Sequence, residues 1–208
     1  MFNFLLQLEI QTVLTSLFLL VASVIIGLTI EKFRSKKFKT VVKKINIVYS
    51  PLIMILFLLV FKFNFVQVIK YYVLFTILFH ASYCDIKTRE VDDYISVMLL
   101  LIGLINFNES NLFYMFLGAI FVFLPQIIMT IFSKSVPIGG ADIKISTACG
   151  FVFGPHIGLS SLCVGLVSAL IVNMILAKQK KQKNISFPFI PYFFFGLIAS
   201  FFLFPAYL

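Results

Sequence analysis

The sequence predicts an all-α fold: a polytopic integral membrane bundle with about 8 transmembrane helices, forming one membrane domain over residues 1–208. Apolar residues make up 61% of the chain and charged residues only 12%, whereas soluble domains carry roughly 25% charged residues. A membrane-spanning helix needs about 20 apolar residues, so eight helices would occupy most of the chain. This composition excludes a large extramembrane domain and a nucleic-acid-binding domain.

The predicted spans follow the apolar runs in chain order. The first run, about 11–30, lacks the small-residue cleavage site of a secretory signal, so we expect it to remain in the mature protein as an amino-terminal helix. A basic loop follows it, and together they form an amino-terminal part over residues 1–44. Two of the runs, 94–107 and 143–153, are short and would need tilting or extension by their flanks to span. The remaining runs lie at about 45–61, 66–84, 112–132, 157–177 and 187–203.

The distribution of basic residues predicts the orientation. The net charge is +9, and all Lys and Arg residues except Lys62 and Lys70 fall in or beside four loops. Basic residues concentrate on the cytoplasmic side of a membrane protein, so we place these loops in the cytoplasm and the amino terminus outside. The cluster Lys178 to Lys183 is expected to bind anionic lipid headgroups of the inner, cytoplasmic membrane, and a docking site for a charged partner is the alternative. The four loops are 31–44, 85–93, 133–142 and 178–184.

Two acidic residues stand at junctions between an apolar run and a cytoplasmic loop. Asp85 follows the run that ends at Cys84, and Asp142 precedes the run that begins at Ile143. Either acid alone could be an ordinary interfacial carboxylate, with Asp142 capping its helix. Two carboxylates at one membrane level can instead share a proton, so that one activates water while the other donates to a carbonyl oxygen. The pair therefore indicates aspartyl hydrolysis without a metal or a covalent intermediate.

Other catalytic chemistries are poorly supported. His80 and Asp85 would diverge by about 140° on a continuous helix, and His156 falls on the opposite side of the membrane. The cysteines Cys84, Cys149 and Cys163 form no CxxC pair. We therefore expect no metal site and no cofactor.

The segments that carry these acids resemble a known family. Cys84 to Asp93 and Pro137 to Lys144 are similar to the two signatures of the type IV prepilin peptidases and the related archaeal preflagellin peptidases, D-x-[KR]-x-[KR] and GxGD. By this resemblance Asp85 and Asp142 match the catalytic pair, with Gly139 and Gly140 in the second motif.

Further positions extend the resemblance to about residues 66–208, the expected peptidase region. Lys144 matches the lysine after GxGD, and Asp93 matches the second acidic or amide position of the first motif. The segment Ser186 to Tyr192 resembles the family's carboxy-terminal motif.

The sequence departs from the family pattern in three places. Ala141 replaces the second glycine of GxGD, which reduces the backbone freedom of that turn. Asp92 stands where many members have proline. The cytoplasmic insertion with paired CxxC zinc sites, associated in larger members with amino-terminal methylation, is absent between the first two spans, so we expect neither zinc nor methyl transfer.

The resemblance implies a membrane aspartyl endopeptidase that removes leader peptides from type IV prepilin-like precursors at the cytoplasmic face. We expect Glu90, Asp92 and Asp93 to receive the basic leader. A preflagellin peptidase is the close alternative. A transporter that uses Asp85 and Asp142 as a proton or cation relay is the alternative from another class, but the acids are not near the bilayer midplane and no repeated halves are visible. The oligomeric state is left open by the sequence.

Overall fold

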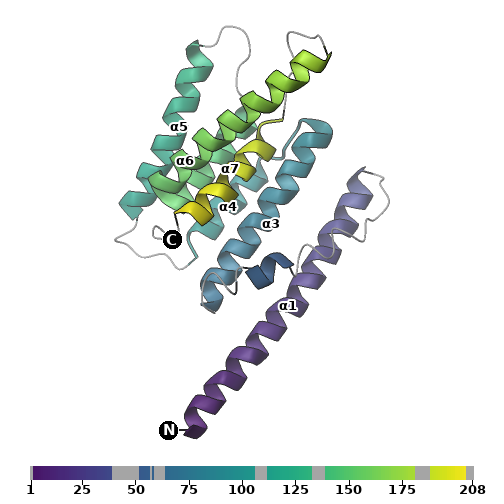
Figure 1. Cartoon of the computed structure of the whole chain (residues 1–208), viewed down its shortest axis with the longest axis vertical. Coiled ribbons are helices and arrows are strands. Elements are labelled where there is room, and N and C mark those ends of the chain that lie inside the picture. The colour runs from purple at the N-terminus through teal and green to yellow at the C-terminus, as the bar shows by residue number, and fades with distance from the viewer. Residues whose placement is uncertain are drawn as a thin grey trace. The chain divides into compact units, whose positions relative to one another are not determined.

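The computed structural model of the chain describes residues 2–38, 52–56, 58, 64–105, 112–132, 139–180 and 188–204. Within these ranges the regular structure is entirely helical, which confirms the predicted all-α class. Figure 1 shows these helices, labelled in chain order. They are α1 (Phe2–Phe38), α3 (Phe65–Thr88), α4 (Tyr94–Gly103), α5 (Leu112–Phe132), α6 (Gly140–Lys180) and α7 (Ile190–Leu203).

Four of these helices are long and apolar enough to cross a membrane, so the protein is a multi-pass membrane protein. They are Thr12–Lys32, Phe65–Thr88, Leu112–Phe132 and Gly140–Leu176, while α4 and α7 are apolar but shorter. The predicted count of about eight spans is not confirmed. Two predicted runs, 143–153 and 157–177, lie on either side of the non-helical residue Gly154 within α6, and the run 45–61 lies mostly outside the described residues.

The chain divides into two compact units, Met1–Thr76 and Ile77–Leu208. In the first unit the Tyr72 hydroxyl donates a hydrogen bond to the Ser23 carbonyl oxygen at 3.3 Å, which joins α1 to the first half of α3. Helix α1 continues to Phe38, so the first part of the predicted basic loop 31–44 is helical. Residues 39–44 of that loop lie outside the described residues.

In the second unit α6 packs between α5 and α7. The contacts rely on small residues: a Cβ atom on Gly150 would lie 2.6 Å from the Gly118 carbonyl oxygen, and one on Gly165 would lie 2.9 Å from the Phe193 Cα. Glycine at such positions lets helix backbones approach closely, as is common in membrane bundles, where packing rather than hydrophobic burial drives association. The core of this unit is therefore a close-packed set of helices that holds the helix ends in fixed positions.

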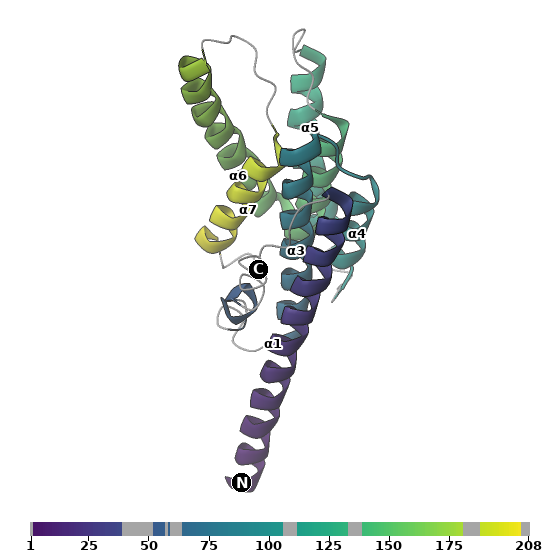
Figure 2. The ribbon, with the colours of Figure 1, turned by 90° about the vertical axis from the view of Figure 1, so that its right-hand side faces the viewer.

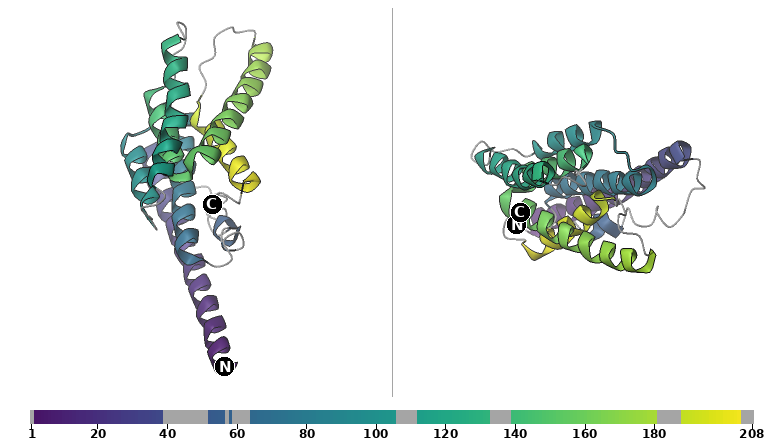
Figure 3. Two further views of the ribbon diagram at one scale, coloured as in Figure 1. Left: turned by 90° about the vertical axis from the view of Figure 1, so that its left-hand side faces the viewer. Right: turned by 90° about the horizontal axis from the view of Figure 1, so that it is seen from above.

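A sharp bend at Gly154 divides α6 into two legs. Gly154 has φ 76° and ψ −179°, a conformation that L side chains rarely adopt, and Pro155 follows it. Gly158 lies beside Gly150, since a Cβ on Gly158 would be 3.0 Å from the Gly150 Cα, whereas a continuous helix would separate the two by about 12 Å. The second leg then crosses α7 at an angle, with the two chain directions opposed (Figures 2 and 3). The starts of α6 and α7 consequently lie at the same end of the unit.

Candidate functional site

Asp85 lies in the last turn of α3 and is only 6% exposed. Its Oδ2 accepts a hydrogen bond of 3.1 Å from the backbone N–H of Ile190, which is the first residue of α7 and lies 105 residues later in the chain. The N-cap residue of α7, Phe189, makes no side-chain capping bond. The Asp85 carboxylate therefore satisfies an N–H group at the start of a different helix, where the helix dipole favours negative charge.

The end of α3 explains why Asp85 is helical. The sequence predicted that the helix stops at Cys84, but it continues to Thr88. The Thr88 hydroxyl bonds to the Cys84 carbonyl oxygen at 3.0 Å, and the Arg89 N–H bonds to the Asp85 carbonyl oxygen at 3.1 Å. Arg89 has φ 59°, the left-handed conformation that usually ends a helix at a glycine. These bonds satisfy the last carbonyl groups and add one turn, which holds Asp85 within the packed unit.

Asp142 lies in the first turn of α6 and is half-buried. Its carboxylate accepts a hydrogen bond from the Gly139 backbone N–H, and the Ile143 N–H donates to the Gly139 carbonyl oxygen at 3.2 Å. Asp142 therefore reaches back from the third helical position to the residue before the helix, as the acid of a capping box does. The suggested capping role is present, but at this position and not at the N-cap itself.

The two carboxyl groups are close enough that the charge of Asp85 acts on Asp142. Each lies at the start of a helix, Asp85 at α7 and Asp142 at α6, where unpaired N–H groups carry partial positive charge. Two acids that share a site resist ionising together, so one of them tends to hold a proton. This arrangement can supply a charged and a neutral carboxyl group side by side.

Lys144 and Asp93 connect the start of α6 to the start of α4. Their side chains form an ion pair with 2.8 Å between Nζ and Oδ1, and both are well exposed, at 55% and 73%. Asp93 is the N-cap residue of α4, yet its carboxylate makes no capping bond. Exposed ion pairs of this kind contribute about 0–1 kcal/mol to stability. The pair therefore orients two side chains at the edge of the site and adds little to the stability of the fold.

The remaining predicted site residues also lie at this end of the unit. Glu90 and Asp92 are exposed in the connection between α3 and α4. Gly139 and Gly140 are exposed at the start of α6. The carboxyl groups that were predicted to receive a basic leader are therefore accessible.

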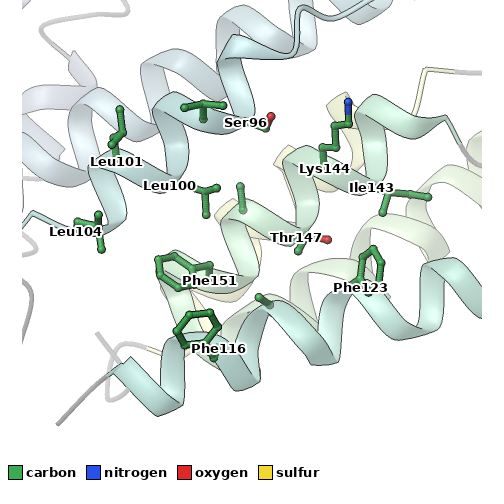
Figure 4. A pocket seen from close by; sticks show the side chains of 13 residues that line it. Ser96, Leu100, Leu101, Leu104, Phe116, Phe123, Ile143, Lys144, Thr147 and Phe151 are labelled. Atoms are coloured by element: carbon green, nitrogen blue, oxygen red, sulfur yellow. The ribbon is translucent and has the colours of Figure 1, made fainter. Parts of the chain in front are cut away.

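An apolar groove opens beside Lys144 between α4, α5 and α6 (Figure 4). It has a volume of about 640 Å³ and begins near Ser96 and Lys144. From there it extends along the helices toward Leu104, Phe116 and Phe151. The groove thus starts within two residues of Asp142 and continues into the apolar part of the bundle.

Two contributions to the site were not found from the sequence. The Ile190 N–H carries no sequence signal, because every residue except proline has one. The side-chain pair Gln126 and Ser146 was missed as well, although a glutamine inside an apolar span is a signal that could have revealed it. Among the described residues no group of three or more His, Cys, Asp or Glu side chains could hold a metal ion.

Comparisons with known proteins agree with the resemblance noted in the sequence. The model of the type IV leader peptidase family matches residues 72–204, a region that contains both aspartates and helices α4 to α7. No curated protein and no solved structure matches the chain. Because the matched region covers more than half of the sequence, the chain belongs to the type IV leader peptidase family and is a peptidase of the prepilin type.

Proposed function

We propose that this protein is an aspartyl endopeptidase that removes the leader from prepilin-like precursors, with Asp85 and Asp142 as its catalytic pair. The observation that carries the proposal is that Asp85, in the last turn of α3 and bonded to the start of α7, and Asp142, in the first turn of α6, come together at one end of the unit although their helices are far apart in the chain. Family membership gives the peptidase activity and supports a prepilin-like class of substrate. The paired acids supply the chemistry for that activity.

The reaction follows from one charged and one neutral carboxyl group. The charged carboxylate takes a proton from a water molecule, and the resulting hydroxide attacks the carbonyl carbon of the scissile peptide bond. The neutral carboxyl group donates its proton to the carbonyl oxygen as the tetrahedral intermediate forms. Collapse of the intermediate breaks the C–N bond, and a proton passes to the leaving amine. No covalent bond to the enzyme forms. The protonation state is a property of the two acids together and not of either acid alone.

Cleavage takes place at the cytoplasmic face, with the amino terminus of the enzyme outside. The concentration of basic residues in the loops beside Asp85 and Asp142 supports this orientation. Water reaches the acids at this interface more easily than in the bilayer interior. The membrane is the inner, cytoplasmic membrane of the cell, in which the basic segment Lys178 to Lys183 would contact anionic lipid.

The substrate would present two chemically different parts to the site. Glu90 and Asp92 are exposed carboxylates that suit the positive charge expected on the cytoplasmic flank of a membrane-inserted polypeptide. The groove beside Lys144 is lined by apolar side chains, which suits an apolar segment after the scissile bond. Gly139 leaves room for the Asp142 carboxylate, since a Cβ atom there would lie 2.8 Å from the Asp142 Oδ2. Lys144 forms an ion pair with Asp93 at the edge of the site.

The test is co-expression of the enzyme with a prepilin-like precursor, with leader loss followed by mass. We expect Asp85→Asn and Asp142→Asn each to reduce cleavage by about a thousandfold or more, because each change removes an acid or base that nothing else replaces. Wild-type rates in either variant would refute the catalytic pair. A chelator should leave cleavage unchanged, and inhibition by the chelator would indicate a metal mechanism.

The same assay separates the remaining alternative within the family. A preflagellin peptidase would cleave preflagellin-type precursors in preference to prepilins. We expect the prepilin-like precursor to be cleaved with the higher kcat/KM. The opposite preference would assign the chain to the archaeal type.

A further inference from the structure

Gln126 is an amide side chain in the interior of an apolar helix. It lies in α5 directly after Pro125, and only 1% of it is exposed. A buried amide group without hydrogen bonds costs about 1–3 kcal/mol, so an unconstrained membrane helix would favour an apolar residue here. The proposed chemistry makes no use of this amide.

The Gln126 amide bonds across the bundle to Ser146 in α6. Its Nε2 donates to the Val122 carbonyl oxygen at 2.9 Å and to the Ser146 Oγ at 2.8 Å. Its Oε1 also lies 3.0 Å from the Ser146 Oγ. Ser146 is itself 1% exposed, so this is a buried bond between two helices that water does not replace.

Ser146 transmits this contact to the turn that carries Asp142. Its hydroxyl lies 2.6 Å from the Asp142 carbonyl oxygen, the shortest of its contacts, and 3.2 Å from the Ile143 carbonyl oxygen. A hydroxyl that accepts a hydrogen bond becomes a stronger donor. The chain of bonds from Gln126 through Ser146 to the Asp142 backbone therefore fixes the first turn of α6 against α5.

We propose that Gln126 and Ser146 are positioning residues that set the rotation of the first turn of α6, and through it the placement of the Asp142 carboxyl group against Asp85. The proposal rests on the catalytic pair put forward above. Asp85 is held by α7, whereas Asp142 belongs to a helix start that is joined to α5 by the buried bond between Gln126 and Ser146. A displacement of about 1 Å in a catalytic group can reduce a rate by about a hundredfold, so such a link has a measurable effect on turnover.

The experiment compares the full-length enzyme with Gln126→Met, Ser146→Ala and the double variant. Methionine keeps the length and apolar stem of glutamine without the amide. Ser161→Ala is the matched control: Ser161 is a fully buried serine of the same helix that also bonds to a carbonyl oxygen four residues earlier, but it lies in the second leg of α6. Each variant is assayed for kcat, KM, the pH dependence of kcat and thermal unfolding in detergent.

We expect each single variant to lower kcat by about tenfold to a hundredfold with KM unchanged within twofold. The double variant should lose no more than the worse single variant, because both changes break one chain of bonds. The bell-shaped pH profile should narrow, since coupling between the two carboxyl groups weakens with their separation. Ser161→Ala should keep the wild-type kcat and pH profile.

Three outcomes would overturn the proposal. The first is a wild-type kcat in both single variants, and the second is a rise in KM with kcat unchanged. The third is a loss of activity that is no larger than in Ser161→Ala and is explained by the fraction of unfolded protein. Asp142→Asn in the same assay separates this failure from failure of the catalytic pair. If Asp142→Asn abolishes cleavage while the Gln126 and Ser146 variants behave as wild type, only the positioning role is wrong. If Asp142→Asn cleaves normally, the catalytic pair itself is wrong.

Discussion

Asp85 and Asp142 lie at the same end of the bundle but are held in different ways. Asp85 is 6% exposed and accepts a hydrogen bond from a backbone N–H group 105 residues away, at the start of α7. Asp142 is half-buried and bonds within its own helix start, to the Gly139 N–H. One acid therefore depends on the docking of a distant helix, and the other on a local turn that its neighbour α5 supports through Ser146.

This difference indicates which substitutions should affect each acid. Changes that loosen α7 act on Asp85, whereas changes in the turn before α6 act on Asp142. The proposed catalytic pair should require both supports, so we expect that each support can be removed separately and its effect measured through the same reaction.

Among changes to the two supports, the largest effect is expected from removing the Ile190 N–H. Replacing Ile190 with its α-hydroxy acid, incorporated by nonsense suppression, exchanges this N–H for an oxygen and keeps the side chain. A hydrogen bond to a charged group contributes about 1.5–3 kcal/mol, so we expect cleavage to fall by roughly tenfold to a hundredfold. Unchanged kinetics would show that the bond to Asp85 has no part in catalysis.

The matched control for this position is Ile190→Ala, which keeps the N–H and removes a side chain that is 1% exposed. Loss of a buried isoleucine typically costs about 2–5 kcal/mol of stability. We expect the alanine variant to unfold at a lower temperature while each folded molecule keeps its activity. The two variants together separate the role of the backbone from that of packing.

A moderate effect is expected at the turn that holds Asp142. A Cβ atom on Gly139 would lie 2.8 Å from the Asp142 Oδ2, so Gly139→Ala must displace the carboxylate, and we expect kcat to fall by about tenfold. Gly140→Ala adds the same methyl group where no atom lies within 4 Å, and it should keep the wild-type rate. Equal rates in the two variants, measured by leader loss, would show that the room left by Gly139 for the Asp142 carboxylate does not matter for catalysis.

The smallest effects are expected at the exposed rim. Asp93→Asn breaks the ion pair with Lys144 and should change stability by no more than about 1 kcal/mol. If Asp93 also attracts a basic leader, KM should rise about two- to threefold for a precursor with a basic leader and stay constant for one with a neutral leader.

Lys144→Gln is the counterpart, because it breaks the same ion pair and leaves Asp93 available to the leader. We expect this variant to keep or lower the KM for the basic precursor. A rise in KM in both variants would show that the ion pair itself, and not the Asp93 carboxylate, shapes leader binding.

The sequence predicts the helical class and brings attention to the two acids, because apolar runs and isolated charges are visible without coordinates. It is less informative about helix ends. The helix that carries Asp85 extends one turn beyond its apolar run, since Thr88 and Arg89 satisfy its last carbonyl groups. Such bonds depend on backbone conformation, which a pattern of residue types records poorly.

The contacts between helices could not be predicted from the sequence, for a related reason. The Ile190 N–H is a backbone group, and Gln126 is identified as a support only when its partner Ser146 is known. The apolar runs 143–153 and 157–177 correspond to the two legs of α6, which the non-helical residue Gly154 separates. The sharpness of the bend between them, which brings Gly158 beside Gly150, is not visible in the sequence.

The bend at Gly154 also determines what surrounds the helix that carries Asp142. The first leg of α6, from Gly140 to Phe153, rises only about 21 Å, whereas the hydrocarbon region of a bilayer is about 30 Å thick. Residues 148–153 at the end of this leg are all buried, so neighbouring helices and not lipid enclose it. A short, enclosed leg gives the opening turn of α6 a protein environment on the side away from the membrane surface.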